Sequence, residues 1–164
     1  MNPHDLLKHA ESIAHSDPAD LTQSILRRAV STAYYAIFHL LTESGGAKLS
    51  THAAVRQTLA RKFDHGRMVK ASDSVVKKTL KEPLKSLIGS IPAELAIVAS
   101  TFKEMQSHRH KADYDTRSSS NFTLIQTIQI AQQVRTAFEE WDKIKDTVAG
   151  EAYVLSMLIE FPDR

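Results

Sequence analysis

The longest apolar pattern in the chain spans Leu21–Leu41. Apolar and small residues repeat there at helical spacing and form two neighbouring rows, one of Leu21, Ile25, Ala29, Ala33, Ile37 and Leu41 and one of Leu26, Val30, Tyr34 and Phe38. Asp17 is a suitable N-cap and Pro18 a suitable first helical residue, and the pair Gly45–Gly46 is expected to end the helix. The second half is apolar or small on almost every side, so we expect other helices, or a partner chain, to surround it.

Four further patterns predict helices on both sides of this one. They lie at residues 3–15, 51–63, about 92–109 and about 121–148. Asn2 can cap the first, Ser50 or Thr51 the one that begins at 51, and Ser120 or Asn121 the last. Each helix has a predicted core stripe: Leu6, Leu7, Ala10, Ile13 and Ala14; Val55, Leu59 and Phe63; Leu95, Val98, Phe102 and Met105; Ile130, Val134, Ala137, Trp141, Ile144 and Val148. We therefore predict an all-α protein.

Two segments are harder to assign. The run Asp64–Gly66 is expected to end the third helix, and residues 66–91 are the least regular part, with a short helix after Ser72 that Pro83 must end or kink. After Gly150, the apolar tail at 151–164 fits a short helix through Val154, Leu158 and Phe161, although it could also form a strand. Left in water it would be an apolar patch, so it should pack on the helical domain of residues 1–150 or on a partner chain.

Composition narrows the functional classes. The 164 residues are 42% hydrophobic and 24% charged, and the absence of cysteine excludes disulfides and thiolate metal sites. The sequence has neither a signal-peptide pattern nor an apolar run long enough to span a bilayer, so we expect a cytoplasmic protein. Phosphate-binding glycine loops, His-Glu-x-x-His and Glu-x-x-His pairs are all missing, so we expect neither a cofactor nor a metal. A net charge of +2 does not by itself argue for nucleic acid.

Positive charge is concentrated locally. The segment Arg61–Lys85 holds eight Lys or Arg residues against three Asp or Glu. It is either a solvated connection or a contact surface for nucleic-acid phosphates, since clustered positive charge releases counterions on binding. Without interleaved aromatic residues, nothing there indicates base stacking.

The most unusual residue in the pattern is Arg109, which falls where the apolar row of its helix asks for another hydrophobic side chain. Charges are seldom buried unless they are paired. In one interpretation Arg109 caps the helix carbonyls or pairs with Asp113, and Tyr114 tucks into the core. In the other, Arg109 and a nearby histidine, His108 or His110, meet a phosphate. The two histidines could share a ligand only if the helix has already ended.

Together, several segments resemble the HEPN-domain family. RRAVSTAYYAIFHLL is similar to the second helix of that family, and THAAVRQTLARKFDHGRM to its third helix and the following loop. SHRHKADYD resembles the Arg-x-x-x-Asp-Tyr signature of one large branch. The resemblance covers roughly residues 18–146. It implies a single-domain, partly up-down bundle of about five helices in a prokaryotic protein, a homodimer, and a nucleotidyltransferase or toxin–antitoxin partner.

The resemblance also implies RNA or nucleotide binding. The binding candidates are Arg109, Lys111, Asp113, Tyr114, His65 and Arg67. Many family members are metal-independent ribonucleases that use an arginine followed four to six residues later by a histidine. Arg109 has no histidine at that distance, so an active ribonuclease toxin would use His110 or His108 instead. We therefore expect a binding module, with a ribonuclease and a purely structural adaptor as the alternatives.

Overall fold

The computed structural model describes residues 2–159, and helices are the regular secondary structure throughout that range, which confirms the all-α class. The described residues form eight α-helices instead of about five. They are α1 (Pro3–Glu11), α2 (Gln23–Leu49), α3 (Ala53–Ala60), α4 (His65–Val76), α5 (Leu84–Ile88), α6 (Ala93–Tyr114), α7 (Leu124–Ile144) and α8 (Val148–Ser156). Short 3₁₀ turns lie at Ser12–His15, Pro18–Asp20 and Ser118–Ser120. No helix in the described range is long and apolar enough to cross a membrane.

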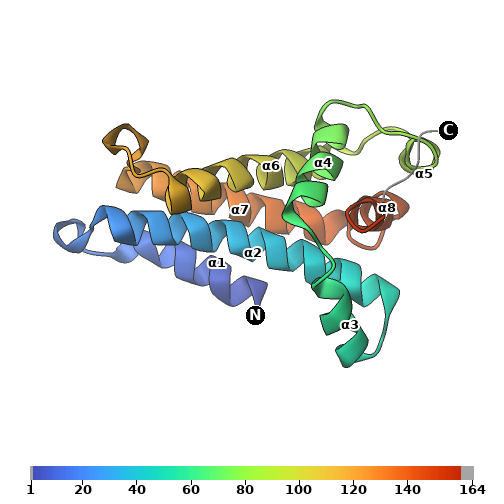
Figure 1. Ribbon diagram of the computed structural model, residues 1–164, viewed down its shortest axis with the longest axis horizontal. Coiled ribbons are helices and arrows are strands. Elements are labelled where there is room, and N and C mark those ends of the chain that lie inside the picture. Colours follow the sequence, from blue (N-terminus) through green and yellow to red (C-terminus); the bar gives the residue numbers. More distant parts are fainter. Residues whose placement is uncertain (1, 160–164) are drawn as a thin grey trace.

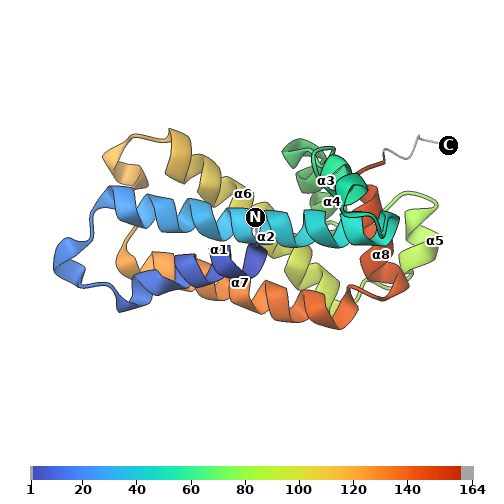
Figure 2. The same cartoon turned by 90° about the horizontal axis from the view of Figure 1, so that it is seen from below.

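Four helices run along the length of the molecule, and α2 lies among them. Figures 1 and 2 show α1, α2, α6 and α7 side by side, with α4, α5 and α8 gathered toward one end of the bundle. α2 packs against α1, α6 and α7, as expected for a helix with so little polar surface. The largest fully buried side chains include Trp141, Tyr34, Tyr153 and Phe102, so one core joins α2, α6, α7 and α8.

Both predicted ends of the long helix are wrong. The Asp17 carboxylate accepts a hydrogen bond from the Ala19 N–H, but only the 3₁₀ turn Pro18–Asp20 follows it. α2 begins after Thr22, whose hydroxyl accepts a hydrogen bond from the Ile25 N–H. The Gly45–Gly46 pair is buried inside α2 and does not end it. A Cβ on Gly45 would lie 2.4 Å from Cζ of Phe63. This glycine therefore allows a close approach between the helix and the chain that follows it.

The segment after α2 differs most from the prediction. Of the expected stripe, Phe63 is buried, but Val55 is 45% exposed and Leu59 only half buried, because α3 packs mainly on α2. Asp64 does not help to end a helix. Its carboxylate accepts a hydrogen bond from the Arg67 N–H at 3.0 Å and caps α4, which begins at His65 and already contains Ser72 and Asp73, the expected cap of the predicted helix.

The later helices follow the prediction more closely. The row Leu95, Val98, Phe102 and Met105 is fully buried, which confirms the core face of α6. α6 nevertheless continues to Tyr114, five residues beyond Arg109. α7 begins with a capping box in which Thr123 and Gln126 bond each other's backbone N–H groups, so neither Ser120 nor Asn121 is its cap.

The start of the apolar tail is helical. Gly150 lies in the first turn of α8 and does not end α7, and Val148, the last member of the α7 stripe, is exposed. A Cβ on Gly150 would lie 2.2 Å from the Ile144 carbonyl oxygen, so only glycine fits this tight turn. The described part of the tail forms no strand: Tyr153 on α8 is fully buried and bonds the Ser72 hydroxyl at 2.7 Å. The predicted division at residue 151 falls inside this helix, and Phe161 lies outside the described residues.

Candidate functional site

Arg109 lies on α6 where the buried row meets the surface, and three groups hold its guanidinium. Nη2 donates hydrogen bonds to the hydroxyls of Tyr35, at 3.2 Å, and Tyr114, at 3.1 Å. Nε lies 2.8 Å from Asp113 Oδ2, an ion pair whose geometry is not that of a hydrogen bond. The side chain of Arg109 is 19% exposed. Its third nitrogen, Nη1, has no hydrogen-bond partner among the described residues and is not buried.

Aromatic rings surround this guanidinium. The Arg109 Cζ atom lies 5.9, 5.8 and 5.1 Å from the ring centres of Tyr34, Tyr35 and Tyr114, within the range of cation–π attraction. Tyr34 is fully buried, whereas Tyr114 is 59% exposed. The prediction that Tyr114 tucks into the core is therefore wrong. It covers the arginine from the solvent side.

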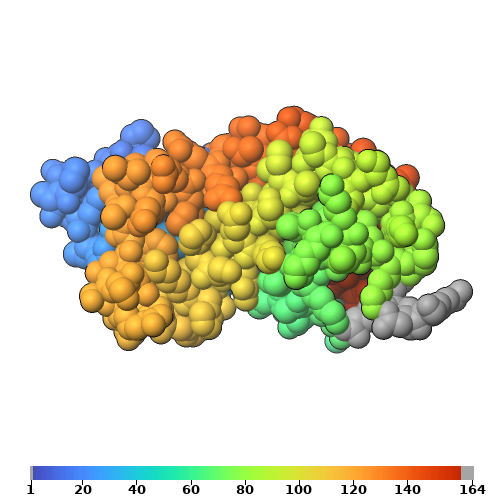
Figure 3. All heavy atoms as spheres, turned by 90° about the horizontal axis from the view of Figure 1, so that it is seen from above, coloured from blue at the N-terminus to red at the C-terminus, as the bar shows by residue number. Residues whose placement is uncertain are grey.

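His65, in the first turn of α4, joins the same group of side chains. Its Nδ1 shares a short hydrogen bond with the Tyr34 hydroxyl, and its ring stacks on Phe38 with 4.4 Å between ring centres. The second ring nitrogen, Nε2, has no hydrogen-bond partner among the described residues. We call Arg109, Tyr34, Tyr35, His65, Asp113 and Tyr114 the Arg109 cluster. It is built from α2, α4 and α6, and Figure 3 shows a recess between the C-terminal part of α6, in yellow, and the green segment that includes α4.

The protonation states in the cluster follow from burial and from the arginine charge. Burial raises the pKa of Tyr34 well above its ordinary value, so this hydroxyl stays protonated. Burial, and then the positive charge of Arg109, lower the pKa of His65, which favours the neutral imidazole. Burial alone would lower the pKa of Arg109, but the hydrogen bond to Tyr35 and the neighbouring groups outweigh it and raise that pKa. The cluster thus holds one fixed cation beside one neutral histidine.

The two histidines next to Arg109 in sequence are not part of the cluster. Since α6 continues through this stretch, each successive residue is turned about 100° around the helix. His108 is half buried and meets Phe122 edge-on, and burial lowers its pKa. His110 is exposed and lies beside the ring of Tyr114.

Two other predicted binding residues also point elsewhere. The Lys111 ammonium lies over the ring of Phe122, 4.9 Å from its centre. The Arg67 guanidinium donates to the Leu158 carbonyl at 3.4 Å. Of the predicted residues, the structure therefore brings together Arg109, Asp113, Tyr114 and His65.

The carbonyls at the end of α6 are capped by a residue that the sequence did not suggest. Nη1 of Arg27 donates to the carbonyl oxygens of Lys111, Ala112 and Asp115 at 3.1, 3.1 and 2.6 Å. Arg27 therefore caps these carbonyls, which is the role that one interpretation gave to Arg109. Tyr34 and Tyr35 were missed as well, because both lie in the apolar second half of the predicted long helix. The available signal was two neighbouring tyrosines, which cannot both point into the same core.

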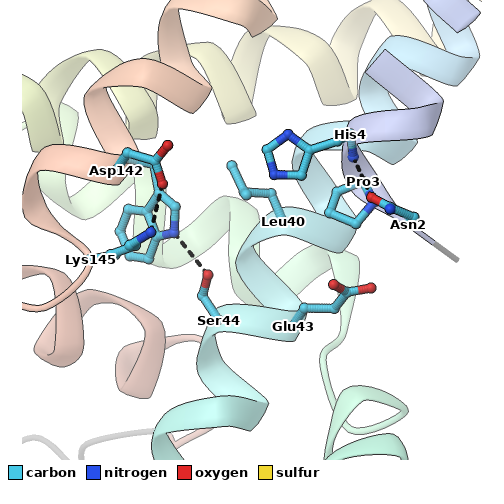
Figure 4. A pocket seen from close by; sticks show the side chains of 9 residues that line it. Asn2, Pro3, His4, Leu40, Glu43, Ser44, Asp142 and Lys145 are labelled. Carbon is cyan, nitrogen blue, oxygen red and sulfur yellow. Dashed lines mark hydrogen bonds and ion pairs between the residues drawn. The ribbon is translucent and has the colours of Figure 1, made fainter. Parts of the chain in front are cut away.

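A second depression, of about 520 Å³, lies between α1, α2 and α7 (Figure 4). Its polar groups mostly satisfy one another: the Trp141 indole N–H donates to Ser44 at 2.9 Å, and Lys145 pairs with Asp142 at 2.8 Å. Nowhere in residues 2–159 do three or more His, Cys, Asp or Glu side chains gather as metal ligands. The Arg109 cluster is therefore the strongest candidate site in the described structure.

The fold and the cluster define an all-α protein in which side chains from three helices surround one arginine. Comparison of the chain with models of protein families, with curated proteins and with solved structures gave no match. The function must therefore be argued from the site itself.

Proposed function

We propose that this protein is a HEPN-type module that binds RNA through the Arg109 cluster, as a homodimer and together with a nucleotidyltransferase or toxin–antitoxin partner. The proposal is carried by one observation: three neighbours fix the Arg109 guanidinium and leave Nη1 without a partner among the described residues. A planar guanidinium is well suited to phosphate, and one held in place loses little entropy when it binds. Fixing a charge in this way is typical of a ligand site.

The aromatic side chains support RNA over a bare anion. Tyr114 is exposed and next to the guanidinium, so its outer face can stack on a base while Arg109 holds the adjoining phosphate. Stacking of this kind is worth about 1–3 kcal/mol per base and tolerates different sequences. RNA is recognised mainly where its bases are unstacked, which fits an exposed ring beside a cation.

One arrangement favours a ribonuclease as the second candidate. His65 reaches the cluster through its bond to Tyr34, and its Nε2 is unpartnered among the described residues. In the tautomer whose Nδ1–H donates to the Tyr34 oxygen, neutral His65 keeps its lone pair on Nε2 and can take a proton from a 2′-hydroxyl while an arginine holds the phosphate, without any metal. This version of the ribonuclease uses His65 where the sequence suggested His108 or His110.

Fluorescence anisotropy with a labelled single-stranded RNA tests the binding proposal. Arg109→Gln should weaken binding about tenfold or more, since a charged hydrogen bond contributes about 1.5–3 kcal/mol, and should reduce the slope of log affinity against log salt by about one. The control is Arg135→Gln, which removes an equal charge from an ion pair with Glu11 outside the cluster. Far-UV circular dichroism checks that both variants fold. Equal binding by Arg109→Gln and wild type would refute the proposal and favour a structural adaptor.

RNA cleavage in EDTA separates the two candidates. Cleavage that is lost in His65→Gln and kept in His110→Gln would identify a metal-independent ribonuclease. A folded wild type that binds RNA and leaves it intact is the binding module that we propose.

A further inference from the structure

A groove of about 920 Å³ runs beside the Arg109 cluster, between α2 and the end of α6. It shares Tyr35 and Asp113 with the cluster, so the two form one continuous surface. Its other lining residues include Ser24, Arg28, Ser31 and Thr116. A ligand phosphate on Arg109 would therefore lie at the end of a groove that is already lined with hydroxyl groups.

The groove side of α2 is a polar stripe on an otherwise apolar helix. Ser24, Arg28, Ser31 and Tyr35 are spaced by four, three and four residues, which places them on one face. This face interrupts a helix that is otherwise largely buried. These side chains are exposed or partly exposed, so they are available to a ligand in the groove.

Two neighbouring arginines on α2 have different surroundings. Arg27 is half buried, and its guanidinium is occupied by the carbonyls at the end of α6. Arg28 is exposed, lines the groove, and makes no side-chain hydrogen bond or ion pair within the described residues. Arg27 therefore stabilises the fold, whereas Arg28 is available to a ligand.

The groove separates Arg28 from Arg109 along α2. Arg28 and Tyr35, whose hydroxyl accepts a hydrogen bond from Arg109, are seven residues apart, or about 10 Å along the helix axis at about 1.5 Å per residue. A strand that runs along the groove would therefore meet Arg109 at one end and Arg28 at the other, and each guanidinium would bind a different phosphate.

We propose that the groove is a second phosphate subsite, in which Arg28 binds another phosphate of the same single RNA strand that Arg109 holds. This inference rests on the proposed function and adds the ligand's size: an oligonucleotide and not a mononucleotide. Ser31 lines the groove between Arg28 and Tyr35, and Ser24 lines it one turn beyond Arg28, so both hydroxyls lie along the path of the ribose–phosphate backbone. The strand is single because Tyr114, at the cluster, stacks only on a base freed from its helix.

The test measures anisotropy of a labelled oligouridine octamer, with and without competition by uridine monophosphate. Arg28→Gln should bind the octamer about tenfold more weakly, with the salt slope reduced by about one, and should leave competition by the mononucleotide unchanged. Glutamine keeps most of the helix propensity of arginine, so the exposed variant should fold. Arg135→Gln again controls for charge.

Three outcomes would overturn the inference. Octamer binding by Arg28→Gln equal to that of wild type removes the second subsite, and if Arg109→Gln still weakens binding, the proposed function stands without it. Equal weakening of octamer and mononucleotide would show that Arg28 acts on the first site. Equal affinity for a duplex of the same length would exclude a single-strand groove. If Arg109→Gln binds both the octamer and the mononucleotide as well as wild type does, the proposed function itself is refuted.

Discussion

Gly45→Ala tests whether the contact between α2 and Phe63 shapes the molecule. Gly45 is buried within α2, and an added Cβ would lie 2.4 Å from Phe63 Cζ, closer than van der Waals contact allows. Phe63 is itself buried, so its ring must move within a packed region. The neighbouring Gly46 differs, because its Cβ would be 3.4 Å from the nearest atom, a carbonyl oxygen of Arg56.

The expected change in the free energy of unfolding follows from two opposing effects. Alanine is favoured over glycine inside a helix by about 0.8–1.0 kcal/mol. Overpacking a core costs about 1–3 kcal/mol. Gly46→Ala should therefore raise the free energy of unfolding by up to about 1 kcal/mol, whereas Gly45→Ala should lower it by about 1 kcal/mol.

Urea unfolding followed by circular dichroism measures both variants under the same conditions. The difference between them, about 2 kcal/mol, isolates the contact, since both share the same change in helix propensity. Combining Gly45→Ala with Phe63→Leu replaces the ring that the new methyl group meets with a smaller side chain. The double variant should recover part of the lost free energy of unfolding as a favourable coupling energy. If Gly45→Ala stabilises the protein as much as Gly46→Ala does, the close approach to Phe63 is not limiting and the reasoning fails.

Two further predictions concern the helix cap and the pH dependence of stability. Arg27→Met should lower the free energy of unfolding by about 2 kcal/mol in urea, because three carbonyls lose a charged donor, while exposed Arg28→Met should change it by less than about 0.5; equal effects would contradict this difference. The folded-state pKa of His65 lies below its ordinary 6.5, so the unfolded chain binds more protons below that pH. The melting temperature should fall from pH 7 to 5, and less steeply in His65→Gln; unchanged steepness would show that His65 does not contribute.

The sequence predicts helix faces better than helix ends. Leu95, Val98, Phe102 and Met105 follow directly from spacing, because an amphipathic helix must bury its apolar row. Glycines misled the prediction of the ends. Gly45 and Gly150 look like terminators, yet each allows a close approach to an atom outside its own helix. Only the packed structure reveals which neighbour occupies the space that a Cβ would need.

Part of the candidate site could be predicted from the sequence. Arg109 could be found because it breaks an apolar row, and its ion pair with Asp113 follows from their spacing of four residues. The histidine could not be chosen in the same way. His108 and His110 are nearest in sequence, but His65 reaches the cluster through the packing of α4 against α6 and through Tyr34. Local spacing carries no information about such a contact.

The position of Arg109 also explains why core and site cannot be separated in this fold. A cation at the end of a buried row is costly unless neighbours compensate its charge and its hydrogen bonds. Asp113 and two tyrosine hydroxyls supply most of that compensation. Tyr34, which packs in the core, also fixes His65 beside them. Because the same residues hold the bundle together and orient the cluster, a phosphate ligand would meet donors already in place, and its binding would stabilise the folded chain.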